Sequence, residues 1–305
     1  MTTPAALAVA TGTACVVASA VAFGAMAILA RVAFASGVDT PTLLALRFAI
    51  AAVAMLSIAR LRRVMLPRGA MLGALVLLGA VGYGGQAFTF FTALTLAPAG
   101  LVALLLYLHL ALVARMAAAF LHERLTAVKL AALALALAGT VLTIAPALTD
   151  TGNVTGGTRI VAGIGFAVAA AVFYALYIVF GAALGRRVSA LQTSTVVIAS
   201  AAAVFVLAAL VRGPQWPQTL TGCLAVLAIA FLSTVAAVTL YFAGLKRIGP
   251  TRASTISTLE PLVTVTLAAI ALGERIAPVQ MAGGALILAA VVLLARARNG
   301  VMGSG

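Results

Sequence analysis

The chain has 305 residues, of which 65% are hydrophobic and only 8% are charged, and its mean hydropathy is +1.25. Soluble domains carry about 25% charged residues, so this composition excludes a soluble domain and indicates a membrane protein that crosses the bilayer many times. The net charge of +14 would suggest nucleic-acid binding in a soluble protein. Here the basic residues lie between apolar runs, which favours membrane topology and anionic lipid headgroups as the explanation.

Ten apolar runs are long enough to be transmembrane helices, because about 20 apolar residues cross ~30 Å of hydrocarbon. The predicted spans are residues 12–34, 41–59, 70–93, 98–120, 126–146, 160–184, 190–211, 219–244, 250–272 and 277–296. The first run has no basic region before it, so we expect a retained helix and not a signal peptide. The predicted fold is therefore an all-α membrane protein of ten helices.

The distribution of Lys and Arg predicts the orientation of these spans. The side that holds the N-terminus carries 13 of them: Arg60, Arg62, Arg63, Arg68, Arg124, Lys129, Arg186, Arg187, Lys246, Arg247, Arg252, Arg296 and Arg298. The opposite side carries four, which are Arg31, Arg159, Arg212 and Arg275. We therefore expect a multi-pass protein of a bacterial inner membrane with both termini in the cytoplasm.

A charged turn occurs twice, as Leu121-His122-Glu123-Arg124 and, 151 residues later, as Leu272-Gly273-Glu274-Arg275. Each copy separates two apolar runs, which predicts one five-helix unit used twice, in residues 1–147 and 148–302. Because five is odd, the second unit has to be inserted upside down. Inverted repeats are typical of transporters that alternate between inward-open and outward-open states around a central cavity. The turns themselves are predicted to fix helix connections.

The paired turns, Leu46-Arg47-Phe48 and Leu259-Glu260-Pro261-Leu262 together resemble the drug/metabolite transporter superfamily of the EamA type. Leu105-Leu106-Tyr107-Leu108 is most similar to the YddG-like bacterial amino-acid exporters within it. The resemblance covers nearly the whole chain. It implies two inverted five-helix repeats around a cavity and export of small metabolites.

Three positions of the first repeat depart from the family pattern. His109-Leu110 stands where the second repeat has Glu260-Pro261, His122 stands where the turn usually has glycine, and Arg115 stands where a small residue is typical. The missing proline leaves open whether this helix is kinked. Natural drift and engineering are both open as the origin of these residues.

Glu260 is the only carboxylate of the sequence inside any predicted span, and it lies near the middle of the bilayer. A charge there costs roughly 2.5–3.5 kcal/mol on insertion scales, so Glu260 should face the cavity, be protonated or have a partner. It is a candidate for binding a substrate amine or coupling a proton, with a structural hydrogen bond as the alternative. Pro261 should leave the carbonyl of Ser257 without its helical partner and kink the helix. His109 is either a cavity residue or a hydrogen-bonded structural histidine.

Polar and aromatic residues on several spans suit a cavity for small amphipathic solutes. Tyr83, Gln86 and Phe90 share one helix face. The full set of predicted cavity residues is Tyr83, Gln86, Phe90, Tyr107, His109, Phe173, Tyr177, Ser233, Tyr241, Ser257 and Glu260. For Arg47 and Arg115 we expect a structural role, with their side chains reaching toward lipid headgroups.

Several functions are disfavoured by what the sequence lacks. It contains no phosphate-binding Gly-Lys motif, no metal-binding cluster and no catalytic constellation, so we predict no cofactor, no metal and no enzyme. We expect a monomer or a dimer whose partners are the lipid bilayer and a small-molecule substrate, without nucleic acid. The predicted function is export of amino acids, among them aromatic or other amphipathic ones, by alternating access. Export of drugs or other metabolites is the alternative within transport, and a non-transporting membrane sensor is the alternative outside it.

Overall fold

The computed structural model describes residues 4–97, 102, 105–149, 157–272 and 277–296, and these are helical apart from short connections. The helices of the first half are α1 (Pro4–Ala35), α2 (Thr40–Leu61), α3 (Ala70–Leu77), η1 (Leu78–Tyr83), α4 (Gly84–Leu96), α6 (His109–Leu121) and α7 (Ala127–Thr149). Those of the second half are α8 (Gly157–Gly185), α9 (Ala190–Arg212), α10 (Leu220–Ala230), η2 (Phe231–Ala236), α11 (Ala237–Ile248), α12 (Pro250–Ile256), α13 (Leu259–Leu272) and α14 (Pro278–Arg296).

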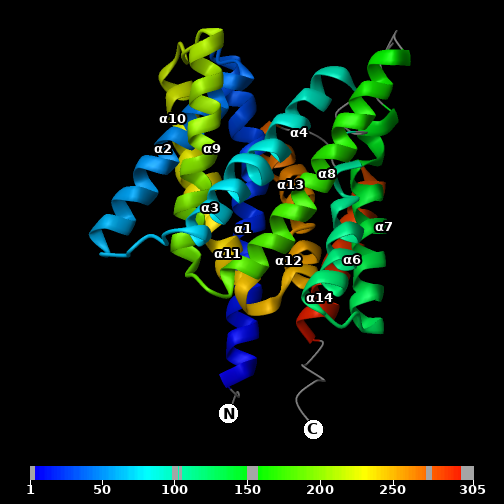
Figure 1. Cartoon of the computed structure of the whole chain (residues 1–305). Coiled ribbons are helices and arrows are strands. Elements are labelled where there is room, and N and C mark those ends of the chain that lie inside the picture. Colours follow the sequence, from blue (N-terminus) through cyan, green and yellow to red (C-terminus); the bar gives the residue numbers. More distant parts are fainter. Residues whose placement is uncertain (1–3, 98–101, 103–104, 150–156, 273–276, 297–305) are drawn as a thin grey trace.

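These elements form ten spans, because α3, η1 and α4 make one continuous helix, as do α10, η2 and α11, and α12 continues into α13. Seven helical stretches in the described chain are long and apolar enough to cross a bilayer, and three shorter apolar helices cover His109–Leu121, Ala127–Thr143 and Pro278–Leu293. The predicted ten-helix membrane fold is confirmed. Figure 1 shows the start of α1 and the end of α14 at the same end of the molecule, as an even number of spans requires.

The two halves share the same local structural features, namely helix caps and π-helical segments. Helices α2 and α9 both begin after a side-chain cap, where Asp39 accepts from the Thr42 backbone N–H and Ser189 accepts from that of Gln192. The third span of each half contains a π-helical segment, η1 in one and η2 in the other. Because each half has five spans, the halves are inverted relative to each other, and α2 packs against α9 through the stacked rings of Phe48 and Phe205.

The fourth span of each half is interrupted, with proline in one half and without it in the other. The turn at residues 257–258 separates α12 from α13, and a turn at residues 107–108 precedes α6. The N–H of Glu260 donates to the Ser257 carbonyl at 3.0 Å, and the N–H of Leu110 donates to the Tyr107 carbonyl at 3.1 Å. Pro261 has no N–H, so the Ser257 carbonyl lacks its helical partner four residues later, as the sequence predicts, and the tighter turn supplies the Glu260 N–H in its place. The fourth span of the first half is thus interrupted although it lacks the proline.

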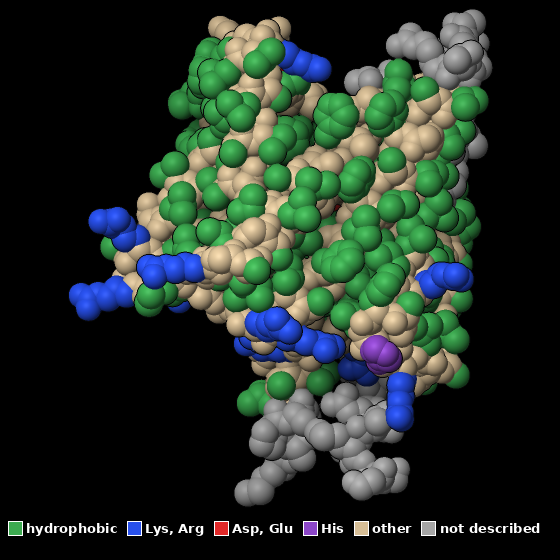
Figure 2. Space-filling model, in the orientation of Figure 1, with side chains coloured by type: hydrophobic (Ala, Val, Ile, Leu, Met, Phe, Trp, Pro, Cys, Tyr) green, Lys and Arg blue, Asp and Glu red, His purple; other side chains and the backbone are tan. Residues whose placement is uncertain are grey.

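Apolar side chains cover most of the face shown in Figure 2, as a bilayer requires, and on this face most Lys and Arg lie toward the end that holds the termini. The large exposed apolar side chains include Leu61, Val211 and Ile270, each more than three-quarters exposed. In a soluble protein such a surface would aggregate, whereas in a bilayer it contacts lipid. Arg115 is exposed, in accord with the expected reach toward headgroups.

The turn after α6 joins the two halves at the end where the chain begins and ends. His122 has a left-handed backbone (φ +54), which explains why glycine would suit this position. Glu123 accepts from Lys129 Nζ at 2.6 Å and from the Thr251 hydroxyl at 3.0 Å, so it ties α7 to the start of α12. Arg124 is exposed. The second turn, with Glu274 and Arg275, lies outside the described residues.

We expect Glu123→Ala to loosen this end of the molecule. Hydrogen bonds to charged groups contribute about 1.5–3 kcal/mol, so transient opening should become about tenfold more frequent or greater. Ser254, one turn into α12, is 1% exposed. With Cys15 and Cys223 replaced by Ser, a membrane-impermeant maleimide should label a Ser254→Cys variant about tenfold faster when Glu123→Ala is added. Arg124→Ala is the matched control, and equal labelling rates for both would refute a closing role for Glu123.

Candidate functional site

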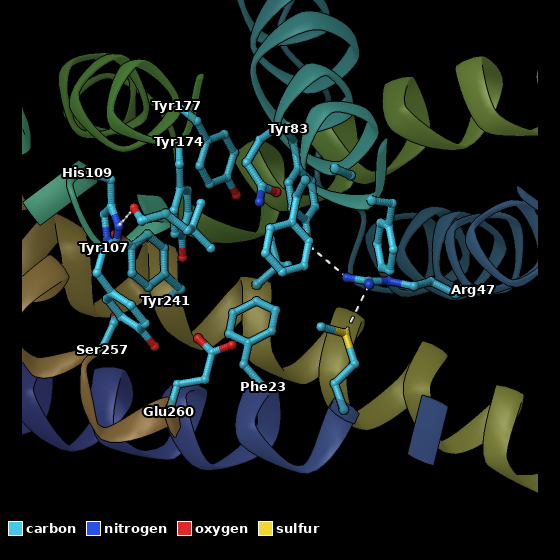
Figure 3. Close-up of a pocket in the computed structure, with 17 residues that line it drawn as sticks. Phe23, Arg47, Tyr83, Tyr107, His109, Tyr174, Tyr177, Tyr241, Ser257 and Glu260 are labelled. Atoms are coloured by element: carbon cyan, nitrogen blue, oxygen red, sulfur yellow. Dashed lines mark hydrogen bonds between the residues drawn. The ribbon is translucent and has the colours of Figure 1, made fainter. Parts of the chain in front are cut away.

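A cavity of about 120 Å³ lies among the spans, at the level of the two interrupted helices. Helices from both halves surround it: α1, α2, α4, α6, α8, α11 and α13 all contribute side chains (Figure 3). Its lining consists of Phe23, Met26, Arg47, Tyr83, Gln86, Ala87, Phe90, Phe91, Leu106, Tyr107, His109, Tyr174, Tyr177, Val238, Tyr241, Ser257 and Glu260.

Most of the predicted cavity residues are brought together here. Tyr83, Gln86, Phe90, Tyr107, His109, Tyr177, Tyr241, Ser257 and Glu260 line this cavity. Two do not. Phe173 packs its ring edge on Gly85 and lines a separate groove, and Ser233 is fully buried with its hydroxyl donating to the Ala22 carbonyl at 2.6 Å. Periodicity could not separate them from cavity residues, because the side on which a helix meets its neighbours depends on packing.

Glu260 lies in the first turn of α13, where the interruption places its side chain against the cavity. Within the described chain its carboxylate forms no hydrogen bond and no ion pair, although its backbone N–H and carbonyl are both used. A carboxylate at membrane depth that lacks a protein partner is costly to keep. It is therefore available to an incoming group.

Two further polar atoms in the cavity wall have no protein partner. His109 Nδ1 lies 2.9 Å from the Leu106 carbonyl, which can only accept, so Nδ1 carries the proton and Nε2 presents a lone pair. Nε2 is buried without a hydrogen-bond partner, and so is the Tyr241 hydroxyl. One nitrogen of His109 is therefore bonded to the backbone, and the other has no partner in the described chain. Unpaired buried polar atoms are rare in native proteins and call for a partner.

The walls of the cavity are aromatic. Tyr177 stacks on Tyr83 with ring centroids 5.1 Å apart, Tyr174 stacks on Tyr177 at 6.2 Å, and the His109 ring lies 4.5 Å from Tyr174. Phe90 meets Phe91 edge to face at 5.6 Å. The rings of Tyr83, Tyr177, Tyr174 and His109 form a continuous surface that can contact apolar groups and cations alike.

Arg47 enters the same cavity, which corrects the expectation that it reaches toward lipid. Its side chain is 5% exposed and belongs to the central packing of α2. The guanidinium donates to the Thr234 hydroxyl at 3.1 Å and to the Tyr83 hydroxyl at 3.0 Å, and it lies 4.6 Å above the Phe48 ring. The sequence offered one signal for this position, since Arg47 lies two turns inside an apolar span.

Sequence reasoning missed Phe23 and Met26 as lining residues. Aromatic and thioether side chains in a membrane span face lipid as readily as a cavity, so their type alone carries no signal. Tyr174 is adjacent to Phe173 in the chain. The rotation of about 100° per helical residue directs the Tyr174 ring to the cavity and the Phe173 ring to the separate groove.

Two larger hollows open on the sides of the molecule, with volumes of about 320 and 840 Å³. Their walls are mainly apolar and include the exposed side chains of Val81 and Phe180 in one and of Phe88 and Val211 in the other. Such grooves suit lipid chains. The Glu260 carboxylate, His109 Nε2 and the Tyr241 hydroxyl lie instead in the smaller central cavity, so we assign the site there.

Ten helices in duplicated halves around a polar cavity define a membrane transporter. The model of the EamA-like transporter family matches residues 10–145 and 161–296, once in each half. The chain belongs to the EamA-like transporter family and is a transporter, not an enzyme. Twenty-eight chains of solved structures match the fold; one, titled only "Crystal structure of protein", has a TM-score of 0.81 and 24% identity over 93% of this chain and 97% of its own. No protein of curated function matches.

Proposed function

We propose that this transporter exports amino acids, among them aromatic or other amphipathic ones, by alternating access, as in YddG-like exporters. The observation that carries the proposal is the unpaired acceptor group in the aromatic cavity. An ammonium group has three N–H donors, and the cavity offers the Glu260 carboxylate, His109 Nε2 and the Tyr241 hydroxyl as unused acceptors. The aromatic rings then accommodate the apolar part of the solute.

The size of the cavity favours small metabolites over drugs. Sites for drug-sized ligands have volumes of about 300–1,000 Å³, whereas this cavity has about 120 Å³. The excess of Lys and Arg at the end that holds the termini supports a cytoplasmic location of both termini in a bacterial inner membrane. We further propose that residues 1–147 and 148–302 are the units that move against each other, and that the monomer is sufficient for transport.

A substrate panel in proteoliposomes tests this proposal. We expect saturable flux of several small amphipathic amino acids, at least tenfold above that of empty liposomes and above that of bulky drug cations. Flux of drugs without flux of amino acids would favour the alternative substrate class. Amino-acid binding in detergent without flux in liposomes would favour a sensor, and either result refutes the proposal.

A further inference from the structure

Arg47 is the one charged group of the cavity that recognition of an amine does not use. It belongs to α2, is almost fully buried, and lines the same cavity as Glu260 (Figure 3). Among the described residues no ion pair joins the two. Burying an arginine at membrane depth costs as much free energy as burying a carboxylate, so an arginine inside the cavity indicates a function.

The guanidinium is only partly occupied by protein groups. It has five N–H donors, and three are engaged: Nε with Thr234, Nη2 with Tyr83, and Nη1 with the Met26 sulfur at 3.0 Å. A thioether is a weak acceptor. Two N–H groups remain, one on each terminal nitrogen, with no partner in the described chain. Two donors on a planar cation match the two oxygens of a carboxylate.

Both π-helical segments hold this guanidinium in place. Tyr83 is the last residue of η1, and Thr234 lies within η2, so each half of the chain contributes one hydroxyl. The Thr234 hydroxyl donates to the Ile229 carbonyl at 3.0 Å, which directs its lone pairs at Arg47 Nε. One extra residue in a helical turn rotates the following side chains by ~100°, so an unbroken α-helix would point these hydroxyls elsewhere. π-Segments are frequent at functional sites for this reason.

The cavity has an acidic group on one side and a basic group on the other. Figure 3 shows Glu260, Ser257, Tyr107, Tyr241 and His109 on one side and Arg47, entering from α2, on the other, with Phe23 between them. A solute with only a positive charge leaves Arg47 uncompensated, and a solute with only a negative charge leaves Glu260 uncompensated. A zwitterion satisfies both.

We propose that Arg47 binds the carboxylate of the substrate, held for that purpose by the two π-helical segments, so that the cavity selects solutes with both a free carboxylate and a free ammonium group. Arg47 is then the specificity-determining residue, and Thr234 is a positioning residue that acts through it. This inference rests on the proposed function and adds the protein group that binds the carboxylate of the substrate.

The test compares an amino acid with its own amide. Flux of L-phenylalanine and of L-phenylalanine amide is measured in proteoliposomes, since the amide keeps the ammonium group and the ring but lacks the carboxylate. The wild-type protein should transport the acid with a KM at least tenfold lower than that of the amide. Arg47→Gln should raise the KM for the acid about tenfold or more and leave that for the amide within about twofold. Arg115→Gln, an exposed arginine of α6, is the matched control and should change neither.

Further variants keep the inference falsifiable if Arg47→Gln does not fold. Thr234→Val should raise the KM for the acid several-fold without changing kcat for the amide, and Thr234→Ser, which restores the hydroxyl, should reverse this. Equal transport of acid and amide by the wild type, or an unchanged preference in both Arg47→Gln and Thr234→Val, would overturn the role of Arg47 while amino-acid transport stands. Absence of flux for both compounds and for the other amino acids would overturn the proposed function and this inference with it.

Discussion

Glu260→Gln is expected to reduce amino-acid transport by about ten- to a hundredfold while the protein still folds. The amide has the shape of the carboxylate but lacks its charge, so a charge-assisted hydrogen bond to the substrate ammonium group, worth about 1.5–3 kcal/mol, is lost. Because the carboxylate has no protein partner in the described chain, its replacement removes a desolvated charge and breaks no contact. Thermal stability in detergent should therefore stay equal or rise.

The matched control for this variant is Asp39→Asn, the same change of acid to amide outside the cavity. Asp39 caps α2 by accepting from the Thr42 backbone N–H at 3.1 Å, and asparagine caps helices as well as aspartate does. Flux by Asp39→Asn should match that of the wild type. Initial rates over a range of substrate concentrations, with protein incorporation measured for each variant, provide the comparison. Wild-type flux by Glu260→Gln would exclude the carboxylate from the transport mechanism.

Gly139→Val is expected to have the largest effect on stability. A Cβ at Gly139 would lie 2.7 Å from the Gly283 carbonyl oxygen and 2.9 Å from the Ile287 backbone N, and backbone atoms of a helix cannot move aside singly. Helices α7 and α14 would have to separate, and overpacking of this kind costs about 3 kcal/mol. Close backbone approach through small residues is a main source of helix association in membranes, where apolar burial gives no advantage over lipid.

A second glycine provides the control for this effect. Gly73 lies in α3, and a Cβ added there would have no atom within 4 Å, so Gly73→Val makes the same chemical change in open space. On heating in detergent, most of the Gly139→Val protein should no longer be monodisperse at temperatures at which the wild type still is. The melting temperature of Gly73→Val should lie within about a degree or two of that of the wild type. Equal melting of the two variants would show that the contact between α7 and α14 does not limit stability.

The sequence alone was sufficient for the architecture. The length of each apolar run predicts a helix that spans the membrane, and the short polar connections set their number at ten. The recurrence of the Glu-Arg turn predicted the duplicated halves, since an odd number of spans per unit leaves only an inverted arrangement. The depth of Glu260 in its span also identified it as a candidate site residue, because a charge at that depth is costly whichever way the helix faces.

Tertiary structure alone decided which face of each helix meets the cavity. In a bilayer the lipid-facing and protein-facing sides are both apolar, so hydrophobic periodicity carries little information about direction. Tyr174 lines the cavity while its neighbour Phe173 does not, and Ser233 turns away to bond α1. No sequence pattern indicated the two π-helical segments, which are rare in proteins. Those segments bring the hydroxyls of Tyr83 and Thr234 to Arg47. Sequence analysis had placed this arginine at the lipid surface, whereas the tertiary structure places it in the central site.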